Sequence, residues 1–261
     1  MVRDWLQASD PEGEWRESWR QGRSSQVWPI AERYEIAGEL IRQSPNARYL
    51  YWPMARPRLP FELAKVKLGD QDAALAFVNE WGLLGYNRLA AAENRVSGEP
   101  LGFIWHEAKN IRDLLAKIRA LQYPDPNRSQ DEEEKDLREI QLVLSGRLRG
   151  IHPSLEMRDA EAPTGEPLSR LRRAFDWDVL LQVVYWHIWN LIEGGHPLAV
   201  CQECGELFSQ FDSRQRFCPA PEEEVEEVRA GMRTRAQSKC GLRYRQEKLR
   251  KPKGEGHEQA R

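Results

Sequence analysis

Four cysteines provide the clearest chemistry in this sequence of 261 residues, and all of them follow residue 200. They are Cys201, Cys204, Cys218 and Cys240, in the spacing Cys-x2-Cys-x13-Cys-x21-Cys. Thiols arranged in this way form disulfides, exchange electrons in a redox Cys-x-x-Cys, or bind a metal ion. Which of the three applies decides what the C-terminal quarter of the chain is for.

A metal ion fits the spacing best. Two residues separate Cys201 from Cys204 and Gly205 follows, which suits a tight turn whose two sulfurs face one ion. No thioredoxin-like pattern surrounds the pair, and the start of the chain lacks a secretory signal, so we expect a reducing cytoplasm in which disulfides are uncommon. We therefore expect one structural Zn2+, held by all four thiolates at about 2.3 Å.

A basic segment is the second feature that could take part in binding. Residues 229–253 contain ten lysines or arginines and a single acid, Glu247, although the net charge of the whole chain is −2. If this segment is helical through the last cysteine, residues four apart share a face and can lie along phosphates. The residues expected to contact nucleic acid are Arg235, Lys239, Arg243, Arg245, Lys248 and Arg250.

An acidic run precedes the basic segment. Five of the six residues at 222–227 are glutamates, and they follow Pro221. Proline in the first turn and acids near the positive end of the helix dipole are typical of a solvated helix start. We expect this run to fold over the basic surface and to compete with a bound nucleic acid.

The other titratable residues do not indicate an enzyme. His187 lies within an apolar helix, where a hydrogen-bonded core histidine is the ordinary interpretation. His106 and Glu107 lack the second histidine of a zinc-protease motif, and neither a phosphate-binding loop nor a nucleophile elbow occurs. A hydrolytic zinc site is also disfavoured, because four thiolates leave no open coordination position.

The elements that must position these groups are mostly helices. The spacing of apolar residues predicts helices over 30–43, 70–81, 103–121 and about 132–148, with a small β-hairpin around Leu155 and Leu168. The segment 178–193 has almost no polar face, which predicts a fully buried central helix that ends at Gly194. We therefore predict a mostly α fold.

These patterns divide the chain into three parts. The predicted helical domain covers 1–196, of which 1–25 is loosely ordered, and the zinc module with its basic helix covers 197–253. The last part, 254–261, is a flexible tail. No apolar run is long enough to cross a bilayer, so we expect no membrane partner and a cytoplasmic location.

The residues around the four cysteines resemble a known family. The segments 201–205, 216–218 and 240–245 are similar to the CGNR-type zinc finger of bacterial proteins, in which the finger follows a helical domain called ABATE. The resemblance is specific over about 201–218 and 240–250, and more general over about 30–200. It implies a transcription regulator of the stress-induced type, with the four cysteines as zinc ligands.

The chain departs from the family pattern in two places. Leu242 stands where the family has the asparagine of its four-letter motif, so any polar contact of that asparagine is lost. Residues 219–239 separate the third and fourth cysteines, where the family has only a few residues. His196 is the alternative fourth ligand if Cys240 does not return to the site.

Two functions therefore compete. The first is a regulator that binds nucleic acid, DNA rather than RNA, through the zinc module, while the helical domain senses a signal or docks onto the transcription machinery. The second is a protein-interaction adaptor, in which zinc only shapes a surface. Binding to nucleic acid across salt concentrations separates them.

Overall fold

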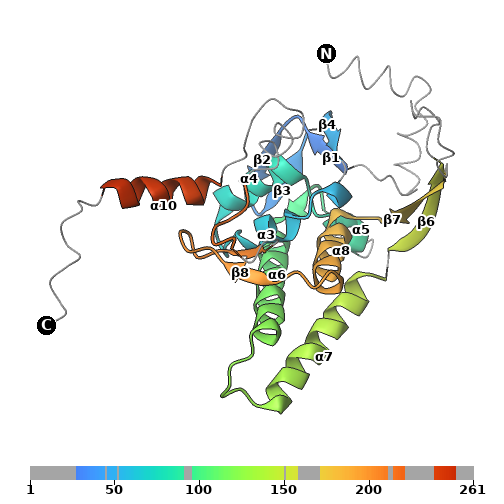
Figure 1. Cartoon of the computed structure of the whole chain (residues 1–261). Helices are drawn as coiled ribbons and strands as arrows, with labels where there is room; N and C mark the ends of the chain where they lie inside the picture. The colour runs from blue at the N-terminus through green and yellow to red at the C-terminus, as the bar shows by residue number, and fades with distance from the viewer. Residues whose placement is uncertain are drawn as a thin grey trace, which may run out of the picture.

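The structure is a computed structural model in which helices alternate with short antiparallel strands (Figure 1). It describes residues 28–44, 46–51, 53–90, 96–149, 151–157, 171–210, 214–220 and 238–250. The predictions for residues 1–25, for the acidic run and for the tail at 254–261 fall outside these residues.

The first described elements are strands, so the predicted helix over 30–43 is wrong. Strand β1 pairs antiparallel with β4, and β2 pairs with β3, which in turn pairs with β5. The bounds are β1 Trp28–Ala31, β2 Tyr34–Ala37, β3 Leu40–Gln43, β4 Ala47–Tyr51 and β5 Glu99–Pro100.

The error has a physical cause. Ile30, Tyr34 and Ile41 are all buried as expected, at 1%, 5% and 0% exposure, but each comes from a different short strand. The spacings of four and seven residues between them match one face of a helix by coincidence, because a turn lies between each strand and the next. Gly38, at φ 65°, begins the two-residue loop between Ala37 and Leu40, a position that favours glycine in a hairpin.

Short helices at 53–55, 59–64 and 86–89 were not predicted, whereas the helices predicted over 70–81, 103–121, about 132–148 and 178–193 are present with similar bounds. Asp70 caps one of them by accepting a hydrogen bond from the Ala73 N–H at 2.8 Å, and Ser129 forms a capping box with Glu132 at another. The bounds are η1 Pro53–Ala55, α3 Leu59–Ala64, α4 Gln71–Trp81, α5 Tyr86–Leu89, α6 Leu101–Gln122, α7 Gln130–Arg147 and α8 Leu180–Glu193.

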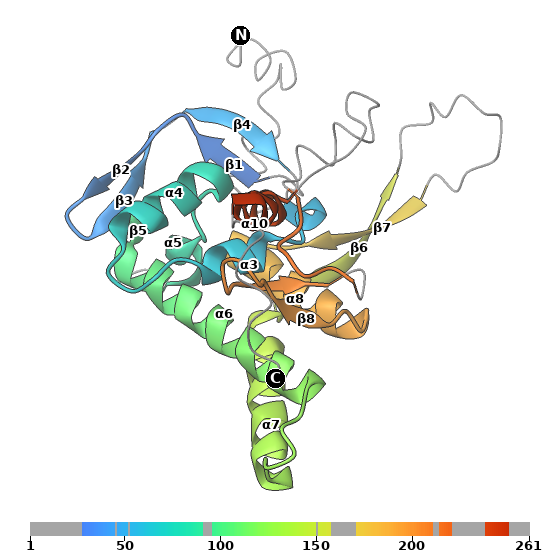
Figure 2. The ribbon, with the colours of Figure 1, turned by 60° about the vertical axis from the view of Figure 1, so that its left-hand side comes forward.

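Helix α6 organises the hydrophobic core. It contacts α3, α4 and α7 as well as β5, while α8 packs against α3, α7 and η1. Strands β1 to β5 lie toward one end of α6, and α7 extends beyond the other end (Figure 2). The apolar face of α6 predicted from the sequence is buried: Ile104, Ala108, Ile111 and Leu115 are each 0% exposed.

A charged group lies within this core. Glu107 of α6 is 1% exposed, accepts a hydrogen bond from the Tyr185 hydroxyl at 2.9 Å and pairs with Arg147 of α7. The Arg147 guanidinium also lies 5.6 Å from the centre of the Tyr185 ring. Because a buried carboxylate is costly without partners, these contacts make the junction of α6, α7 and α8 specific.

Helix α8 is central but not buried all round. Nine of its residues, including Tyr185, His187 and Ile188, are buried, yet Trp189 and Ile192 near its end are 43% and 39% exposed. His187 is the hydrogen-bonded core histidine that was expected, since its Nε2 lies 2.8 Å from the Pro53 carbonyl oxygen. The predicted burial therefore holds for most of the helix and fails at its C-terminal turn.

The predicted hairpin is present and projects from the helical body (Figure 1). Strand β6 His152–Met157 pairs antiparallel with β7 Leu171–Asp176, with Leu155 opposite Arg173. Leu168, named in the prediction, lies outside the described residues. The fold is thus a helical region with several small antiparallel sheets, and none of the described helices is long and apolar enough to cross a membrane.

Candidate metal centre

A short hairpin places the first two cysteines. Strand β8 Leu198–Val200 pairs antiparallel with β9 Leu207–Ser209, and Cys201 follows β8 directly. Gly205, at φ 75°, turns the chain back toward β9 immediately after Cys204. Glycine adopts this left-handed conformation without the strain that a side chain would add.

Backbone hydrogen bonds fix the shape of this turn. The Gly205 N–H donates to the Cys201 carbonyl at 2.9 Å, and the Cys201 N–H donates to the Glu206 carbonyl at 2.9 Å. The Gln202 N–H donates to the Arg216 carbonyl at 3.0 Å, which joins the turn to the arm at 214–220 that carries Cys218. Three of the four cysteines are therefore positioned by one hydrogen-bonded unit.

The fourth cysteine comes from a helix. Cys240 is the second residue of α10 Lys239–Arg250. Ser238 precedes this helix, and its hydroxyl accepts a hydrogen bond from the Gly241 N–H at 3.3 Å while its carbonyl accepts one from the Leu242 N–H at 2.9 Å. This N-cap sets the direction in which the first turn presents Cys240.

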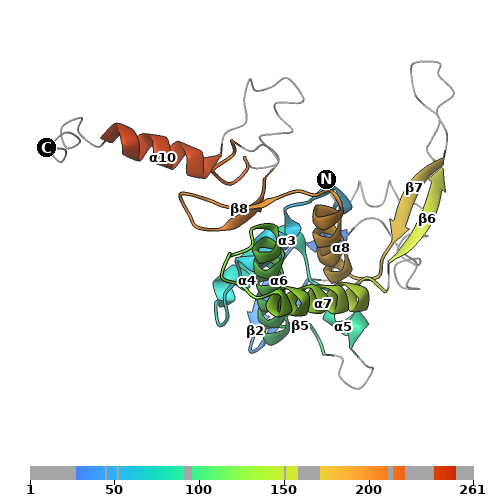
Figure 3. The same ribbon diagram turned by 60° about the horizontal axis from the view of Figure 1, so that its bottom comes forward.

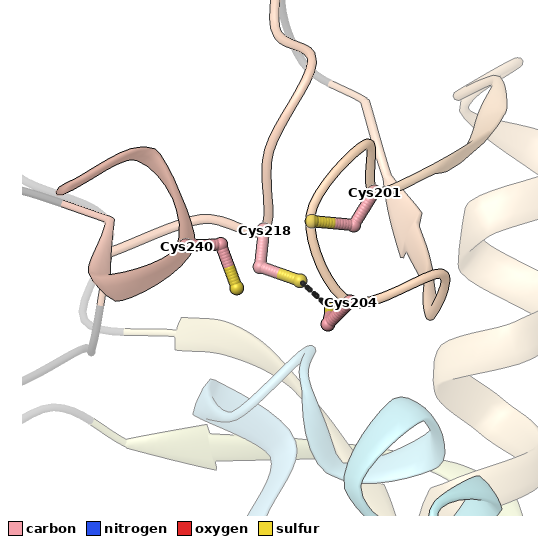
Figure 4. A group of neighbouring side chains, drawn as sticks. All are labelled: Cys201, Cys204, Cys218 and Cys240. Atoms are coloured by element: carbon pink, nitrogen blue, oxygen red, sulfur yellow. Dashed lines mark hydrogen bonds between the residues drawn. The ribbon is translucent and has the colours of Figure 1, made fainter. Parts of the chain in front are cut away.

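The four thiols converge on one point (Figure 4). Their Sγ atoms all lie within 4.8 Å of one another, and the Sγ atoms of Cys204 and Cys218 are 3.5 Å apart. Four sulfurs at about 2.3 Å from a central zinc would be about 3.8 Å apart, so the cluster has the size of a tetrahedral thiolate site. Among the described residues, the cluster consists of these cysteines and does not include His196.

The local environment favours the thiolate of Cys201 and disfavours those of Cys218 and Cys240. Burial alone would raise the pKa of Cys201, but backbone N–H groups of Cys204, Glu203 and Cys218 point at its sulfur and lower the pKa to about 7. Burial raises the pKa of Cys218, and burial together with the neighbouring thiols raises that of Cys240 to about 11. A bound cation removes this conflict, because its charge stabilises all four thiolates at once.

Aromatic packing attaches α10 to the cysteine arm. The rings of Phe217 and Tyr244 are 5.0 Å apart between centres, and Gly241 is buried beside the Phe217 ring. A β-carbon at Gly241 would lie 3.5 Å from that ring, which is an ordinary van der Waals contact, so the helix and the ring are closely packed. The helix is thus held through a thiol and an aromatic pair together.

The module also packs against the helical region. The Gln122 side chain, at the end of α6, donates to the His196 carbonyl at 3.0 Å and accepts from the Leu198 N–H at 2.8 Å. Arg58, which immediately precedes α3, donates to the Ala220 carbonyl at 3.4 Å, just beyond Cys218. Leu198 itself is 0% exposed and belongs to the main core.

The structure describes part of the predicted basic surface. Lys239, Arg243 and Arg245 are exposed on α10, and the Arg245 Nε donates to the Gly241 carbonyl at 3.2 Å. Lys248 and Arg250 belong to the same helix, whereas Arg235 lies outside the described residues. By helical register Lys239 and Arg243 share one face of α10, and Arg245 lies on the opposite side.

Sequence reasoning missed Ser238, the residue that caps α10. Its signal was present, because a serine three residues before Gly241 at the start of a helix is an ordinary N-cap. No family model matches this chain, and no curated protein sequence matches it.

Proposed function

We propose that this chain is a zinc-dependent regulator that binds nucleic acid through α10. One observation carries the proposal: Cys240 of the thiol cluster lies in the first turn of the helix that exposes Lys239, Arg243 and Arg245. A metal ion at the cluster would therefore fix the orientation of the basic helix relative to the rest of the chain.

Zinc is the metal that we assign to the cluster. Four thiolates form a soft, closed ligand set, which zinc occupies in structural sites without needing an open position. The residues that would hold it are Cys201, Cys204, Cys218 and Cys240, whose spacing in space matches such a site. Bound there, zinc would supply rigidity and no reaction, and we propose no enzymatic activity for the chain.

The placement of α10 suits nucleic acid. The helix extends away from the helical body (Figures 1 and 3), and the side chains of Lys239, Arg243 and Arg245 are exposed on it. Its sequence carries five lysines or arginines and one acid, Glu247. Cations on two opposite faces would meet phosphates on both walls of the DNA major groove, which admits a helix, whereas the major groove of duplex RNA is too narrow.

The resemblance to CGNR-type fingers with ABATE domains adds to this proposal. In that assignment the helical region would receive a signal or dock onto the transcription machinery in a cytoplasmic protein. Leu242, which replaces the family asparagine, is half-buried at the base of α10. We therefore assign phosphate recognition to the flanking cations and not to this position.

Anisotropy of a fluorescent duplex DNA, measured across salt concentrations, tests the proposal. We expect affinity to fall steeply with salt, and Arg243→Ala combined with Arg245→Ala to lower the log–log slope by about 1.8, which is about 0.9 for each lost phosphate contact. Arg138→Ala is the matched control, because Arg138 is an exposed helical arginine on α7, which lies well away from α10 (Figure 1).

Absence of salt-dependent binding by the zinc-loaded protein at low ionic strength would refute the proposal. The adaptor function would then lead, with the same basic helix meeting an acidic protein. Equal slopes for the double variant and the wild type would instead remove Arg243 and Arg245 from the interface.

A further inference from the structure

A cavity of about 310 Å³ lies where the helical region meets the cysteine arm. Its walls come from α3, α8 and β9, together with Cys218 and Pro219. This volume is at the lower end of the range of small-molecule sites, about 300–1,000 Å³. Most of the lining is apolar, and the principal apolar residues are Met54, Phe61, Leu191, Leu207 and Phe208.

His187 supplies a hydrogen-bond acceptor in the wall of this cavity. The carbonyl oxygen of Pro53 can only accept, so the hydrogen bond at 2.8 Å places the ring proton on Nε2. Burial lowers the pKa of His187, which keeps the imidazole neutral. Its Nδ1 is then a lone-pair acceptor on a ring that is 7% exposed and lines the cavity.

Two further polar side chains in the wall have unused hydrogen-bonding capacity. Within the described part of the chain, neither the Asn190 amide nor the Ser209 hydroxyl has a hydrogen-bond partner, although Ser209 is only 9% exposed. Asn190 lies three residues after His187, on the same side of α8. Polar groups of this kind fix the orientation of a ligand within an apolar site.

The rim of the cavity carries a net positive charge. Arg58 and Lys65 both pair with Glu62, at 2.9 Å and 2.7 Å, so two cations face one carboxylate. All three side chains line the opening and remain partly exposed. One cation is therefore in excess, and it would attract an anionic group on a ligand whose apolar part is inside.

We propose that this cavity binds a small, largely apolar aromatic acid that carries a hydrogen-bond donor. The donor would meet Nδ1 of His187, the aromatic body would fill the space between Phe61 and Phe208, and the anionic group would lie at Arg58 and Lys65. This site is distinct from the basic helix, and its occupation does not depend on binding of nucleic acid.

The position of the site gives a bound molecule a structural consequence. Cys218 lines the cavity, and Arg58 at its rim already donates to the carbonyl of Ala220 at 3.4 Å. A ligand here would touch α3, α8 and the cysteine arm at once. Occupation would therefore hold the cysteine arm against the helical region.

The probe for the test is 8-anilinonaphthalene-1-sulfonate, which combines apolar rings, one N–H donor and one anionic group. We expect saturable binding of one equivalent to the zinc-loaded full chain, observed as a rise in fluorescence. Asn190→Phe should fill the cavity and weaken binding by about tenfold or more, equivalent to about 1.4 kcal/mol. Glu193→Phe adds the same ring to the exposed end of α8 and should leave binding unchanged.

A second variant keeps the test decisive if Asn190→Phe fails to fold. Lys65→Glu changes an exposed rim residue and reverses the local charge, so it should weaken the anionic probe while thermal stability stays near that of the wild type. Absence of saturable binding to the wild type, or equal weakening by Glu193→Phe, would overturn the proposal. Binding that ignores Lys65→Glu would also overturn it, because the anionic end would not be at the rim.

Discussion

The helical region and the cysteine module are stabilised in different ways. Around α6 and α8 the buried side chains form one large continuous core. In the module, by contrast, the buried apolar side chains among the described residues are Leu198, Cys201 and Phe208. A region with so little core needs a cross-link or a metal to remain folded, whereas the helical region has enough buried apolar surface of its own.

The two regions also treat buried polar groups differently. In the helical region Glu107 forms an ion pair with Arg147 and accepts a hydrogen bond from the Tyr185 hydroxyl. In the described part of the module, the thiols have one another and a few backbone N–H groups as partners. The first arrangement is complete without a ligand, and the second becomes complete when a cation binds.

Metal removal should produce the largest difference between the regions. We expect one zinc per chain by elemental analysis, and we expect chelation to unfold residues 197–250 while the helices of the N-terminal region persist. The free energy at stake is on the order of 10 kcal/mol, since zinc binding in such modules is folding energy. Amide hydrogen exchange with and without chelator measures the loss region by region.

Two variants, one at Cys240 and one at His196, sharpen this prediction. Cys240→Ala should abolish stoichiometric zinc, whereas His196→Ala should retain it, because His196 is not part of the cluster. The reverse result would move the fourth ligand to His196. If protein purified from cells grown with zinc contains no zinc, the metal assignment itself is wrong.

The second prediction concerns α8 and the difference between its two faces. Ile188 is 0% exposed, so Ile188→Ala should cost about 2–5 kcal/mol of unfolding free energy through a lost core contact and a cavity. Trp189 is 43% exposed, so Trp189→Ala should cost far less than the full truncation of a buried tryptophan, about 3–5 kcal/mol. Urea unfolding followed by helical circular dichroism compares the two.

This prediction replaces the one that the sequence supports. From composition alone, the helix over 178–193 should be buried all round, and Trp186→Ala or Trp189→Ala should each cost about 3–5 kcal/mol. If Ile188→Ala and Trp189→Ala are equally destabilising, the Trp189 side chain is buried in solution, by a contact outside the helical region.

Much of the fold follows from local pattern, and the errors have local causes. The helices around 71–81 and 101–122 were predicted because their apolar spacing is long and is bounded by caps such as Asp70 and Gly82. The strands over 28–43 were missed because each contributes too few residues to show a period of two. The burial of Glu107 could have been predicted, because this residue lies between Ile104 and Ile111 on the apolar face of its helix.

The candidate site divides in the same way. The cysteine cluster could be predicted because four thiols at suggestive spacings are informative even without coordinates. The cavity beside Cys218 could not, because α3, α8 and β9 each contribute a few unremarkable residues that only tertiary packing brings together. The basic helix lies between these cases: its charge is visible in the sequence, but its attachment through Phe217 and Tyr244 is not.

The smallest expected effect on stability comes from replacing an N-cap serine with alanine in each region. Ser129 and Ser238 both cap helices, with their hydroxyls 3.3 Å from the N–H groups of Glu132 and Gly241 respectively. Each loss of an N-cap is worth about 1 kcal/mol. Ser129→Ala should lower the main thermal transition by about 2–4 °C, because α7 packs onto the core of the helical region.

Ser238→Ala should act on the metal centre instead. The capped turn presents Cys240, so weakening it should lower zinc affinity by about fivefold, as measured by competition with a chromophoric chelator. The main thermal transition should stay in place, because α10 extends from the body and contributes little to the core (Figure 3). If Ser238→Ala instead shifts that transition as much as Ser129→Ala and leaves zinc affinity unchanged, the module and the helical region unfold as one unit. Their stabilities would then not be separable, and the metal would be supporting the whole chain.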